Sequence, residues 1–582
     1  MTQLSKLCSS LLSDFFVVNE KPLEGQIKDT LEHFVETLDY GLSGKLEAKF
    51  YLLALDPGMG KSIAISMFLK AWRELSYLPA SSILIGVSRL EEIKSFVEAS
   101  GLPSSDFGVL TSDADMNALG LPQAELGKAR VLFTTQQMIR SRTLGQSFSA
   151  AAEFHFEGAP RVLRLWDESI MPAEPIVIRI DDLHSLASPL RPSHPQFVTA
   201  LEAFVASVPR ETNDCVVTIP FALRHVWPWS SGVGLPSLSP DLNKTFANLG
   251  LVVGTNMLVR LESYYGLQLI GAAETLPSDI APLITVDASG RVRTTYELWE
   301  KHRRNLVRLP AASTSFERLN IHVWNSPVGK DELRSVTKRR VIASAIAELL
   351  PRDPEGQWLV LTYKIIKDEL KAAVERLVGA KASERIEWLT WGKHHGTNEF
   401  RDIDNIVIVG QQTYRTSDYT AFALAASGLS ADRVDELNAT EVREGEHRHH
   451  FLQAVCRASV RKGSGSVAGQ CNAFLVTSMG NTERMLAKTF PGANLCVWKE
   501  PDEAPSGNVG RAMAYLTLMF SSGGLALVTK ADLRDHLGIR ADSLATHVLR
   551  KESFQEFLAD SNLTMWRDGF RRTVCEFDPI AV

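Results

Sequence analysis

Residues 51–70 read YLLALDPGMGKSIAISMFLK. The apolar run at 51–55 is typical of a buried strand, and it stops at the turn-forming DPGMG of 56–60. From Lys61 onward, apolar residues return at the spacing of a helix. Strand, glycine turn, Lys-Ser and helix is the order of a P-loop. The stretch therefore predicts a polyphosphate site at the start of a helix.

Each residue type in the turn has a chemical reason to be there. Gly58 and Gly60 let backbone N–H groups curl around phosphates without a Cβ in the way. Lys61 is predicted to reach the β- and γ-phosphates, and the Ser62 hydroxyl to bind Mg²⁺. The full pattern has another glycine at position 55, where this chain has Leu55, so a plain structural turn is the alternative. We expect ATP and Mg²⁺ as ligands, with nucleotide contacts from Pro57, Gly58, Met59, Gly60, Lys61 and Ser62.

A second apolar run, at 162–166, ends in the adjacent carboxylates Asp167 and Glu168. Asp167 is predicted to complete the Mg²⁺ site with Ser62, and Glu168 to orient and deprotonate the attacking water. Asp181 and Asp182 form a competing acidic pair after 176–180. They are better explained as the start of a helix.

Composition sets limits on the kind of protein. With 582 residues the chain is too long for one core, and about three or four domains are expected. The net charge of −6 gives no overall attraction to nucleic acid, so any such contact must come from a local groove. The six cysteines lack CxxC spacing, and no apolar stretch is long enough to cross a membrane. These features favour a cytoplasmic protein with free thiols and no membrane partner.

The order of short apolar runs and helical patterns predicts two α/β units. Strands at 83–88 and 130–135 alternate with helices after the P-loop, and 215–220 is a candidate to close this first sheet. A second unit begins near residue 318 and has no P-loop of its own; its predicted strands are 319–324, 357–363, 386–392 and 405–410. The expected fold is two tandem RecA-like parallel-sheet domains with a helical insertion and a small C-terminal helical domain. The predicted boundaries are 1–250, 251–317, 318–505 and 506–582.

The stretch FLQAVCRASVR, at 451–461, tests the idea of a two-lobed site. On one helix, Gln453, Arg457 and Arg461 would share a face at i, i+4 and i+8. An arginine from the second lobe would neutralise the transferring phosphoryl group as an arginine finger. A solvated arginine face is the alternative. Nearby, His447, His449 and His450 lack metal-site spacing and are expected in a groove-lining loop.

Other candidates lie at the ends of predicted elements. Thr134 and Thr135 end a strand, where small hydroxyls suit contacts to the phosphates of a single strand, although strand-end capping is the alternative. After a linker at 500–510, helices over 511–520, from 529 to Gly538 and over 542–550 resemble a helix-turn-helix or winged-helix module. That domain could guide a duplex or bind a protein partner.

With these residues in hand, the chain resembles the superfamily 2, DExx-box helicase-like ATPases of the type carried by phages and mobile elements. The resemblance spans most of residues 20–500 and rests on five motifs: DPGMGKS (56–62), FTTQQMI (133–139), WDES (166–169), WGKHHGTNEF (391–400) and QAVCRASVR (453–461). It implies that Lys61, Asp167 and Glu168 act in hydrolysis, with Arg457 and Arg461 as finger candidates. It also implies that Gln26 reads adenine, with an exposed helix glutamine as the alternative, and that Thr134, Thr135, Thr397 and Asn398 lie near a single strand.

Two departures from the family pattern affect this resemblance. The last two arginines are four apart instead of three, which leaves open which one is the finger, and the usual Ser-Ala-Thr coupling motif is not visible. The implied function is an ATP-dependent helicase or translocase, acting on DNA in preference to RNA. The alternative is a nucleotide-switched scaffold ATPase that binds a protein partner without unwinding.

Overall fold

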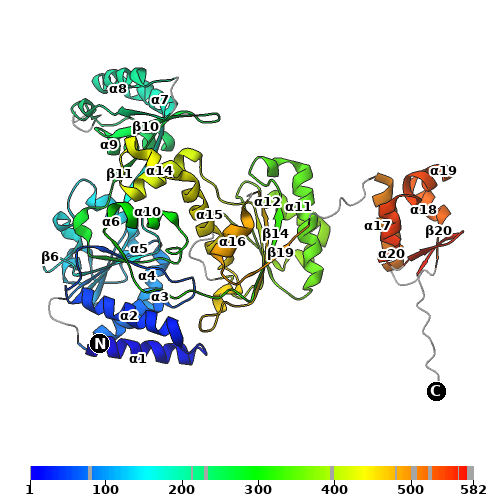
Figure 1. Cartoon of the computed structure of the whole chain (residues 1–582), viewed down its shortest axis with the longest axis horizontal. Helices are drawn as coiled ribbons and strands as arrows, with labels where there is room; N and C mark the ends of the chain where they lie inside the picture. The colour runs from blue at the N-terminus through cyan, green and yellow to red at the C-terminus, as the bar shows by residue number, and fades with distance from the viewer. Residues whose placement is uncertain are drawn as a thin grey trace. The chain divides into compact units, whose positions relative to one another are not determined.

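The computed structural model describes residues 2–76, 81–210, 214–228, 234–392, 399–478, 481–499, 507–521, 527–561 and 563–572 (Figure 1). It divides into two compact units. The first comprises Met1–Ser335 and Leu350–Trp498, and the second comprises Val336–Leu349 and Lys499–Val582. The first unit holds two lobes, each built on its own parallel sheet.

The front lobe is a seven-stranded sheet in the order β13-β1-β12-β7-β2-β4-β3, with every neighbouring pair parallel. Its inner strands are buried on both faces, which is why most of them read as continuous apolar runs, whereas the edge strand β13 is half-buried. The strands of the sheet are β1 (Phe50–Leu53), β2 (Ile83–Val87), β3 (Phe107–Leu110), β4 (Val131–Thr135), β7 (Leu163–Asp167), β12 (Leu283–Val286) and β13 (Leu306–Arg308).

Alternate residues of these strands enter two cores. Leu53 and Leu55 belong to the core that includes residues of four helices: α1 (Gln3–Val18), α2 (Gly25–Leu42), α3 (Lys61–Glu74) and α4 (Leu90–Ser100). Leu52 and Ala54 belong to the opposite core, with residues of α6 (Gln136–Thr143) and α10 (Thr294–Arg303). Helices α1 and α2, which precede the P-loop in the chain, therefore cover one face of its sheet together with α3 and α4.

The insertion differs from the prediction in place and in structure. It runs from 173 to 274 and forms an antiparallel sheet in the order β8-β11-β10-β9. Its strands and helices are β8 (Ala173–Arg179), α7 (Ile180–Leu190), α8 (Pro195–Ser207), β9 (Cys215–Thr218), α9 (Pro240–Val252), β10 (Asn256–Glu262) and β11 (Gly266–Glu274).

Two sequence predictions are wrong here. The strand at 215–220 does not close the front sheet, because β9 pairs with β10 of the insertion. The span 251–317 is not a helical insertion, because it holds two insertion strands, then β12, α10 and β13. A first domain ending at residue 250 would lack both neighbours of the P-loop strand β1.

The insertion sheet is covered on both faces. One face belongs to a core with residues of α7, α8 and α9 (Figure 1). The other face, with Leu258 and Ile270, packs against Ala421 and Leu424 of α14 (Thr416–Ser427), a helix that follows a strand of the rear lobe. An element of the rear lobe is thereby clamped onto the front lobe.

The rear lobe is a six-stranded parallel sheet in the order β16-β15-β17-β18-β14-β19. Its strands are β14 (Leu319–Asn325), β15 (Trp358–Thr362), β16 (Ile386–Thr390), β17 (Asn405–Val409), β18 (Cys471–Thr477) and β19 (Asn494–Val497). Residues of α15 (Ala439–Val455) and α16 (Thr482–Thr489) share a core with this sheet. Helices α12 (Lys367–Val378) and α13 (Ala380–Ser383) lie between its strands in sequence. Two tandem parallel-sheet domains confirm the predicted fold class.

The second unit contains α11 (Val336–Leu349) and the C-terminal residues. Thr529 caps its helix α18 reciprocally with Asp532, and Gly538 ends that helix with φ +67°, at the position where the sequence predicted its end. A three-stranded antiparallel sheet, in the order β20-β22-β21, accompanies the helices. The C-terminal elements are α17 (Gly507–Ser521), β20 (Val528–Thr529), α18 (Lys530–Leu537), α19 (Ala541–Leu544), α20 (Glu552–Asp560), β21 (Leu563–Met565) and β22 (Gly569–Arg572).

Across the described ranges, no helix combines the length and the apolar character needed to cross a membrane.

Candidate active site

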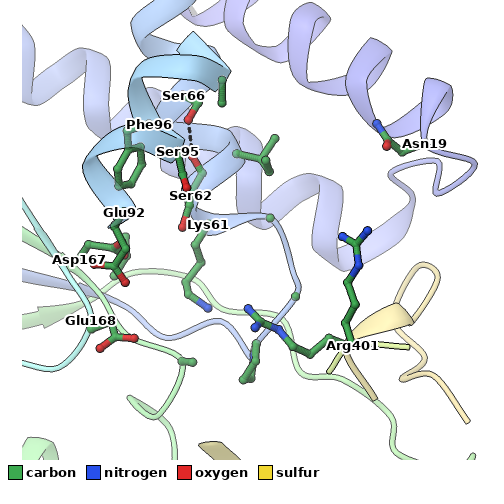
Figure 2. A pocket seen from close by; sticks show the side chains of 18 of the residues that line it. Asn19, Lys61, Ser62, Ser66, Glu92, Ser95, Phe96, Asp167, Glu168 and Arg401 are labelled. Carbon is green, nitrogen blue, oxygen red and sulfur yellow. Dashed lines mark hydrogen bonds between the residues drawn. The ribbon is translucent and has the colours of Figure 1, made fainter. Parts of the chain in front are cut away.

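A cavity of about 750 Å³ lies between the two lobes, at the carboxyl end of the front sheet. Figure 2 shows Lys61, Asp167 and Glu168 reaching into it from the front lobe, while Arg401 approaches from the rear lobe. Most of the predicted site residues line this one cavity: Pro57, Gly58, Gly60, Lys61, Ser62, Asp167, Glu168, Gln453, Arg457 and Arg461.

The two P-loop glycines are required by their surroundings as well as by their backbone angles. Both have φ +89°, a conformation that disfavours any side chain. A Cβ on Gly58 would lie 2.9 Å from the carbonyl oxygen of Arg461, and one on Gly60 would lie 2.6 Å from the ring of Phe16. The loop is therefore pressed between α1 and the rear lobe, and only glycine fits at either position.

Lys61 is the first residue of α3, and its side chain folds back over the loop. Its ammonium group donates to the carbonyl oxygens of Leu55 at 2.6 Å and Asp56 at 3.1 Å. Burial lowers the pKa of Lys61 to about 8, although the charges of Asp167 and Asp56 oppose that shift. A phosphate group would favour the charged form, so the site is suited to an anionic ligand.

The carboxylates form a cluster of three, of which the sequence predicted two. Asp167 is buried, and its pKa lies well above the usual range because of burial and the charges of Glu92 and Glu168. Burial and the charge of Glu168 also raise the pKa of Glu92, to about 7. Glu92, on α4, lines the cavity. A positive charge placed beside Asp167 would therefore favour its ionised form.

Glu168 is held in an uncommon conformation. Its φ is +76°, and its backbone N–H donates to the carbonyl of Val286, at the end of the neighbouring strand β12. Its carboxylate accepts a hydrogen bond of 3.0 Å from the Ser88 hydroxyl. Such left-handed residues are sparse outside glycine and concentrate at functional sites, where the surroundings impose them.

The rear-lobe arginines reach the cavity by a different route from the predicted one. Helix α15 ends at Val455, so Gln453, Arg457 and Arg461 do not share one helix face. Arg457 lies in the turn after the helix, and Arg461 lies in a short 3₁₀ segment, Ser459–Lys462. Both still line the cavity with Gln453.

Arg457 is buried and fixed by its neighbour. Its guanidinium donates to the backbone carbonyl of Gln453 at 3.1 Å and to the side-chain oxygen of Gln453 at 2.6 Å. Burial, with the nearby charge of Arg461, lowers the pKa of Arg457 to about 10, so the group remains cationic at neutral pH. A positioned cation facing the P-loop across a cavity is the arrangement that an arginine finger needs.

The loop after β12 lines the cavity, and the sequence prediction did not include it. Asp287 and Ala288 line the cavity, and Asp287 accepts hydrogen bonds from Tyr296 at 2.7 Å and from the backbone of Ser289 at 2.8 Å. Val286 is in register with Asp167, which places this loop beside the acidic pair. The signal was the apolar run 283–286 followed by Asp-Ala-Ser-Gly, inside a span assigned to a helical insertion.

The same loop also ties the P-loop to the rear lobe. Arg291 forms an ion pair of 2.9 Å with Asp56, which is buried, and donates to the carbonyl of Thr489 in α16 at 2.8 Å. Asp56, the first residue of the phosphate loop, is thus linked to the rear lobe through the Arg291 guanidinium.

Some predicted site residues lie elsewhere. Gln26 is exposed, donates to the carbonyl of Ala311 at 3.2 Å and does not line the cavity. Met59 lines a neighbouring cavity of about 40 Å³ and contacts Thr314.

The residues predicted near a single strand have mixed outcomes. Thr134 is fully buried and donates to the carbonyl of Leu110, which leaves no surface for a strand. Thr135 caps α6 by accepting from the Met138 N–H, so both threonines already make structural hydrogen bonds. Thr397 and Asn398 lie outside the described residues.

The predicted histidine loop is wrong. His447, His449 and His450 are buried on helix α15, and His449 makes a hydrogen bond of 2.5 Å with the Ser289 hydroxyl of the front lobe. His449 therefore contacts the front lobe, and His449 and His450 line a cavity together with front-lobe residues.

The donor set fits a nucleoside triphosphate with Mg²⁺. Ser62 and Asp167 offer the oxygen ligands that Mg²⁺ prefers, and the glycine backbone leaves a cradle for phosphate oxygens that a Cβ would obstruct. The tail of such a ligand would meet Lys61 from the front lobe and arginines from the rear lobe.

No protein-family model matches the chain, and no curated protein matches it significantly. Among solved structures, that of S. tokodaii Xpd4 aligns with a TM-score of 0.43 and 12% identity over 79% of this chain and 98% of that one. S. cerevisiae Dbp5 bound to RNA and ADP BeF3 aligns with a TM-score of 0.34 and 10% identity over 82% and 95%. The DUF1998 helicase MrfA bound to DNA aligns with a TM-score of 0.32 and 11% identity over 95% and 63%. These TM-scores lie below 0.5, so the fold assignment comes from the strand order of the two sheets.

Proposed function

We propose that the chain is an ATP hydrolase of the superfamily 2 type that uses hydrolysis between its two lobes to move along, or unwind, nucleic acid. One observation carries the proposal. Lys61, Ser62, Asp167 and Glu168 of the front lobe line the same cavity as Arg457 and Arg461 of the rear lobe. A site completed by two lobes responds to hydrolysis with a change between them, which is what a motor needs.

The residues divide the chemistry of hydrolysis. Backbone N–H groups near Gly58 and Gly60, with Lys61, hold the β- and γ-phosphates. Ser62 and Asp167 would hold Mg²⁺, which neutralises charge on the phosphate oxygens when bound. Glu168 accepts a proton from the attacking water as its oxygen bonds to the γ-phosphorus and the bond to the leaving β-phosphate oxygen breaks.

Arg457 and Arg461 place positive charge opposite the phosphate loop, where charge accumulates in the transition state. Arg457 is the better candidate for the finger, because its guanidinium is buried and oriented by Gln453. A simple nucleotide switch has less need of such a group, so its position favours turnover over passive binding.

For the nucleic acid, we propose a single-stranded or forked substrate, with DNA favoured over RNA. Thr135 at the end of β4, Thr397 and Asn398 remain the candidate contacts. The C-terminal helices would add a second contact, to duplex or to a protein partner.

The test is the ATPase rate measured against single- and double-stranded DNA and RNA. We expect stimulation by single strands, and a loss of about a hundredfold or more in Lys61→Ala and Glu168→Gln. Asp181→Asn is the matched control, because it changes an acidic residue on the insertion helix α7. ATP turnover that no nucleic acid alters would reject the motor proposal, and tight ATP binding without turnover would favour the switch.

A further inference from the structure

A second cavity, of about 360 Å³, adjoins the first. The two cavities share Glu168, Asp287 and Gln453 as lining residues. Beyond this shared wall the second cavity is lined by residues of both lobes, including Ser88, Arg89, Ser169, Arg293, Tyr414 and His449. It therefore begins at the acidic end of the nucleotide site and lacks any lining residue of the P-loop.

We propose that this second cavity is the exit for inorganic phosphate, an inference that rests on the proposed hydrolysis. In-line displacement places the attacking water on the far side of the γ-phosphorus from the leaving oxygen. Glu168, as the base, marks that side. The transferred group inverts toward the water as the bonds exchange, so the product phosphate forms next to Glu168 and faces the second cavity.

After bond cleavage, the product phosphate cannot leave as easily through the first cavity. The remaining diphosphate would be held by the backbone around Gly58 and Gly60 and by Lys61, so phosphate leaving that way would have to pass the bound product. The shared wall of Glu168, Asp287 and Gln453 is the opposite end. Phosphate that moves past Glu168 leaves the nucleotide in place.

The charges of the second cavity suit passage of an anion. Glu446 is neutralised by a bidentate ion pair with Arg293, at 2.8 and 2.9 Å. Arg89 also lines this cavity and adds positive charge beyond Glu168, although its charge acts on Glu92 of α4 as well. Glu168 and Asp287 repel phosphate at the entrance, and Arg89 attracts it beyond. This combination favours transit over tight retention.

Glu168 also has the geometry of a wall between the two spaces. Its φ of +76° and the hydrogen bond from Ser88 hold its carboxylate at the junction. Ser88 and Arg89 follow strand β2 directly, so the residue that holds the base and the residue that attracts the anion are adjacent.

The experiment separates bond cleavage from release in the full-length protein. Total phosphate after acid quench measures cleavage, and a fluorescent phosphate-binding sensor measures free phosphate in the same mixing experiment. The variants are Arg89→Glu, which reverses the attracting charge, and Ser169→Trp, which fills the cavity. Arg89→Lys is the conservative control for charge, and Ser141→Trp, on an exposed face of α6, is the control for added bulk.

We expect Arg89→Glu and Ser169→Trp to slow the appearance of free phosphate by about tenfold while total phosphate forms at nearly the wild-type rate. The delay should also raise the incorporation of ¹⁸O from water into phosphate before release, which a general structural defect does not produce. Arg89→Lys and Ser141→Trp should follow the wild type.

If free phosphate appears as fast as total phosphate in both Arg89→Glu and Ser169→Trp, as it does in the wild type, the second cavity is not the phosphate exit. If Ser169→Trp does not fold, Arg89→Glu against Arg89→Lys decides alone. Absence of phosphate after acid quench in the wild type overturns the proposed hydrolysis, and the exit with it, so the two failures are distinguishable.

Discussion

At the residue scale, Gly58 is where the phosphate loop comes closest to the rear lobe. We expect Gly58→Ala to lose ATP hydrolysis, because its Cβ would lie 2.9 Å from the Arg461 carbonyl and force the lobes apart. The left-handed φ should also cost about 1–2 kcal/mol in the free energy of unfolding. Steady-state ATPase and urea unfolding measure the two effects.

Gly145→Ala is the matched control for that prediction. Gly145 has φ +76°, and a Cβ there would meet nothing within 4 Å. It should show the same loss of stability with unchanged hydrolysis. Equal ATPase activity in the two variants would show that contact with Arg461 does not matter.

His447 makes the stability of the protein depend on pH. Burial, with the nearby charge of Arg443, lowers its pKa to about 4, whereas an unfolded histidine titrates near 6.5. Between these pH values His447 is protonated in the unfolded chain and neutral in the native state. The free energy of unfolding therefore falls as pH drops from 6.5 toward 4. The full loss is about 3 kcal/mol.

Urea unfolding of wild type and His447→Gln at pH 7 and pH 5 tests this. The variant, which cannot titrate here, should lose about 2 kcal/mol less than the wild type over that interval. Parallel losses in the two proteins would assign the acid sensitivity to other groups.

At the element scale, the loop after β12 and helix α15 join the lobes through buried polar contacts. Arg293 and Glu446 form a bidentate ion pair, and Arg448 donates to the Val292 carbonyl at 2.9 Å. Arg293→Met should destabilise the first unit by about 3–5 kcal/mol in denaturant unfolding, because Glu446 is left buried without its counter-ion.

The double variant Arg293→Met with Glu446→Met provides the comparison. Removing both charges should recover most of that stability, since two apolar side chains of similar volume can replace a buried pair at little cost. A double variant as unstable as Arg293→Met alone would mean that the pair is needed for reasons other than charge.

Sequence patterns predicted the elements that obey local rules. The P-loop strand and helix, the acidic strand end and the capped helix at Thr529 all depend on residues close together in the chain. The return of the chain to the front sheet after the insertion did not follow from local pattern, because β12 and β13 are short apolar runs whose partner β1 lies far back in the sequence. The place of Gln26 beside Ala311 likewise depends on tertiary contacts, which the local pattern does not contain.

The rear-lobe arginines line the predicted cavity, although the single helix that was predicted to carry them is wrong. Spacing predicted one helix through Arg461, whereas α15 ends at Val455 and Ser459 then bonds through its N–H to the Ile403 carbonyl. That long-range contact has no signature in the spacing. The turn nevertheless returns Arg457 and Arg461 to the same cavity.

At the scale of the first unit, helix α14 belongs to the rear lobe in sequence and packs with the front lobe. It contacts the insertion sheet through Ala421 and Leu424, and Arg303 of α10 donates to the Ala426 carbonyl at 3.0 Å. Relative movement of the lobes must therefore occur outside α14. In hydrogen exchange, we expect α14 to show the same protection as β11, with or without a non-hydrolysable ATP analogue.

The nucleotide-dependent change in exchange should fall instead on 399–404 and 456–463, which border the cavity. Lys61→Ala, which weakens phosphate binding, should abolish that change. If the nucleotide changes the exchange protection of α14 together with that of the rear-sheet strands, α14 does not stay fixed to the insertion sheet.

The order of strands in the front sheet has a consequence for biosynthesis. Phe50 of β1 pairs with Leu283 on one side and Leu306 on the other, so both neighbours of the phosphate-loop strand are translated long after it. A nascent chain that has passed the loop but not β13 cannot yet hold it in place. The ability to retain a nucleotide should therefore arise late in translation, and ribosome-stalled chains ending before residue 283 should fail to retain ATP.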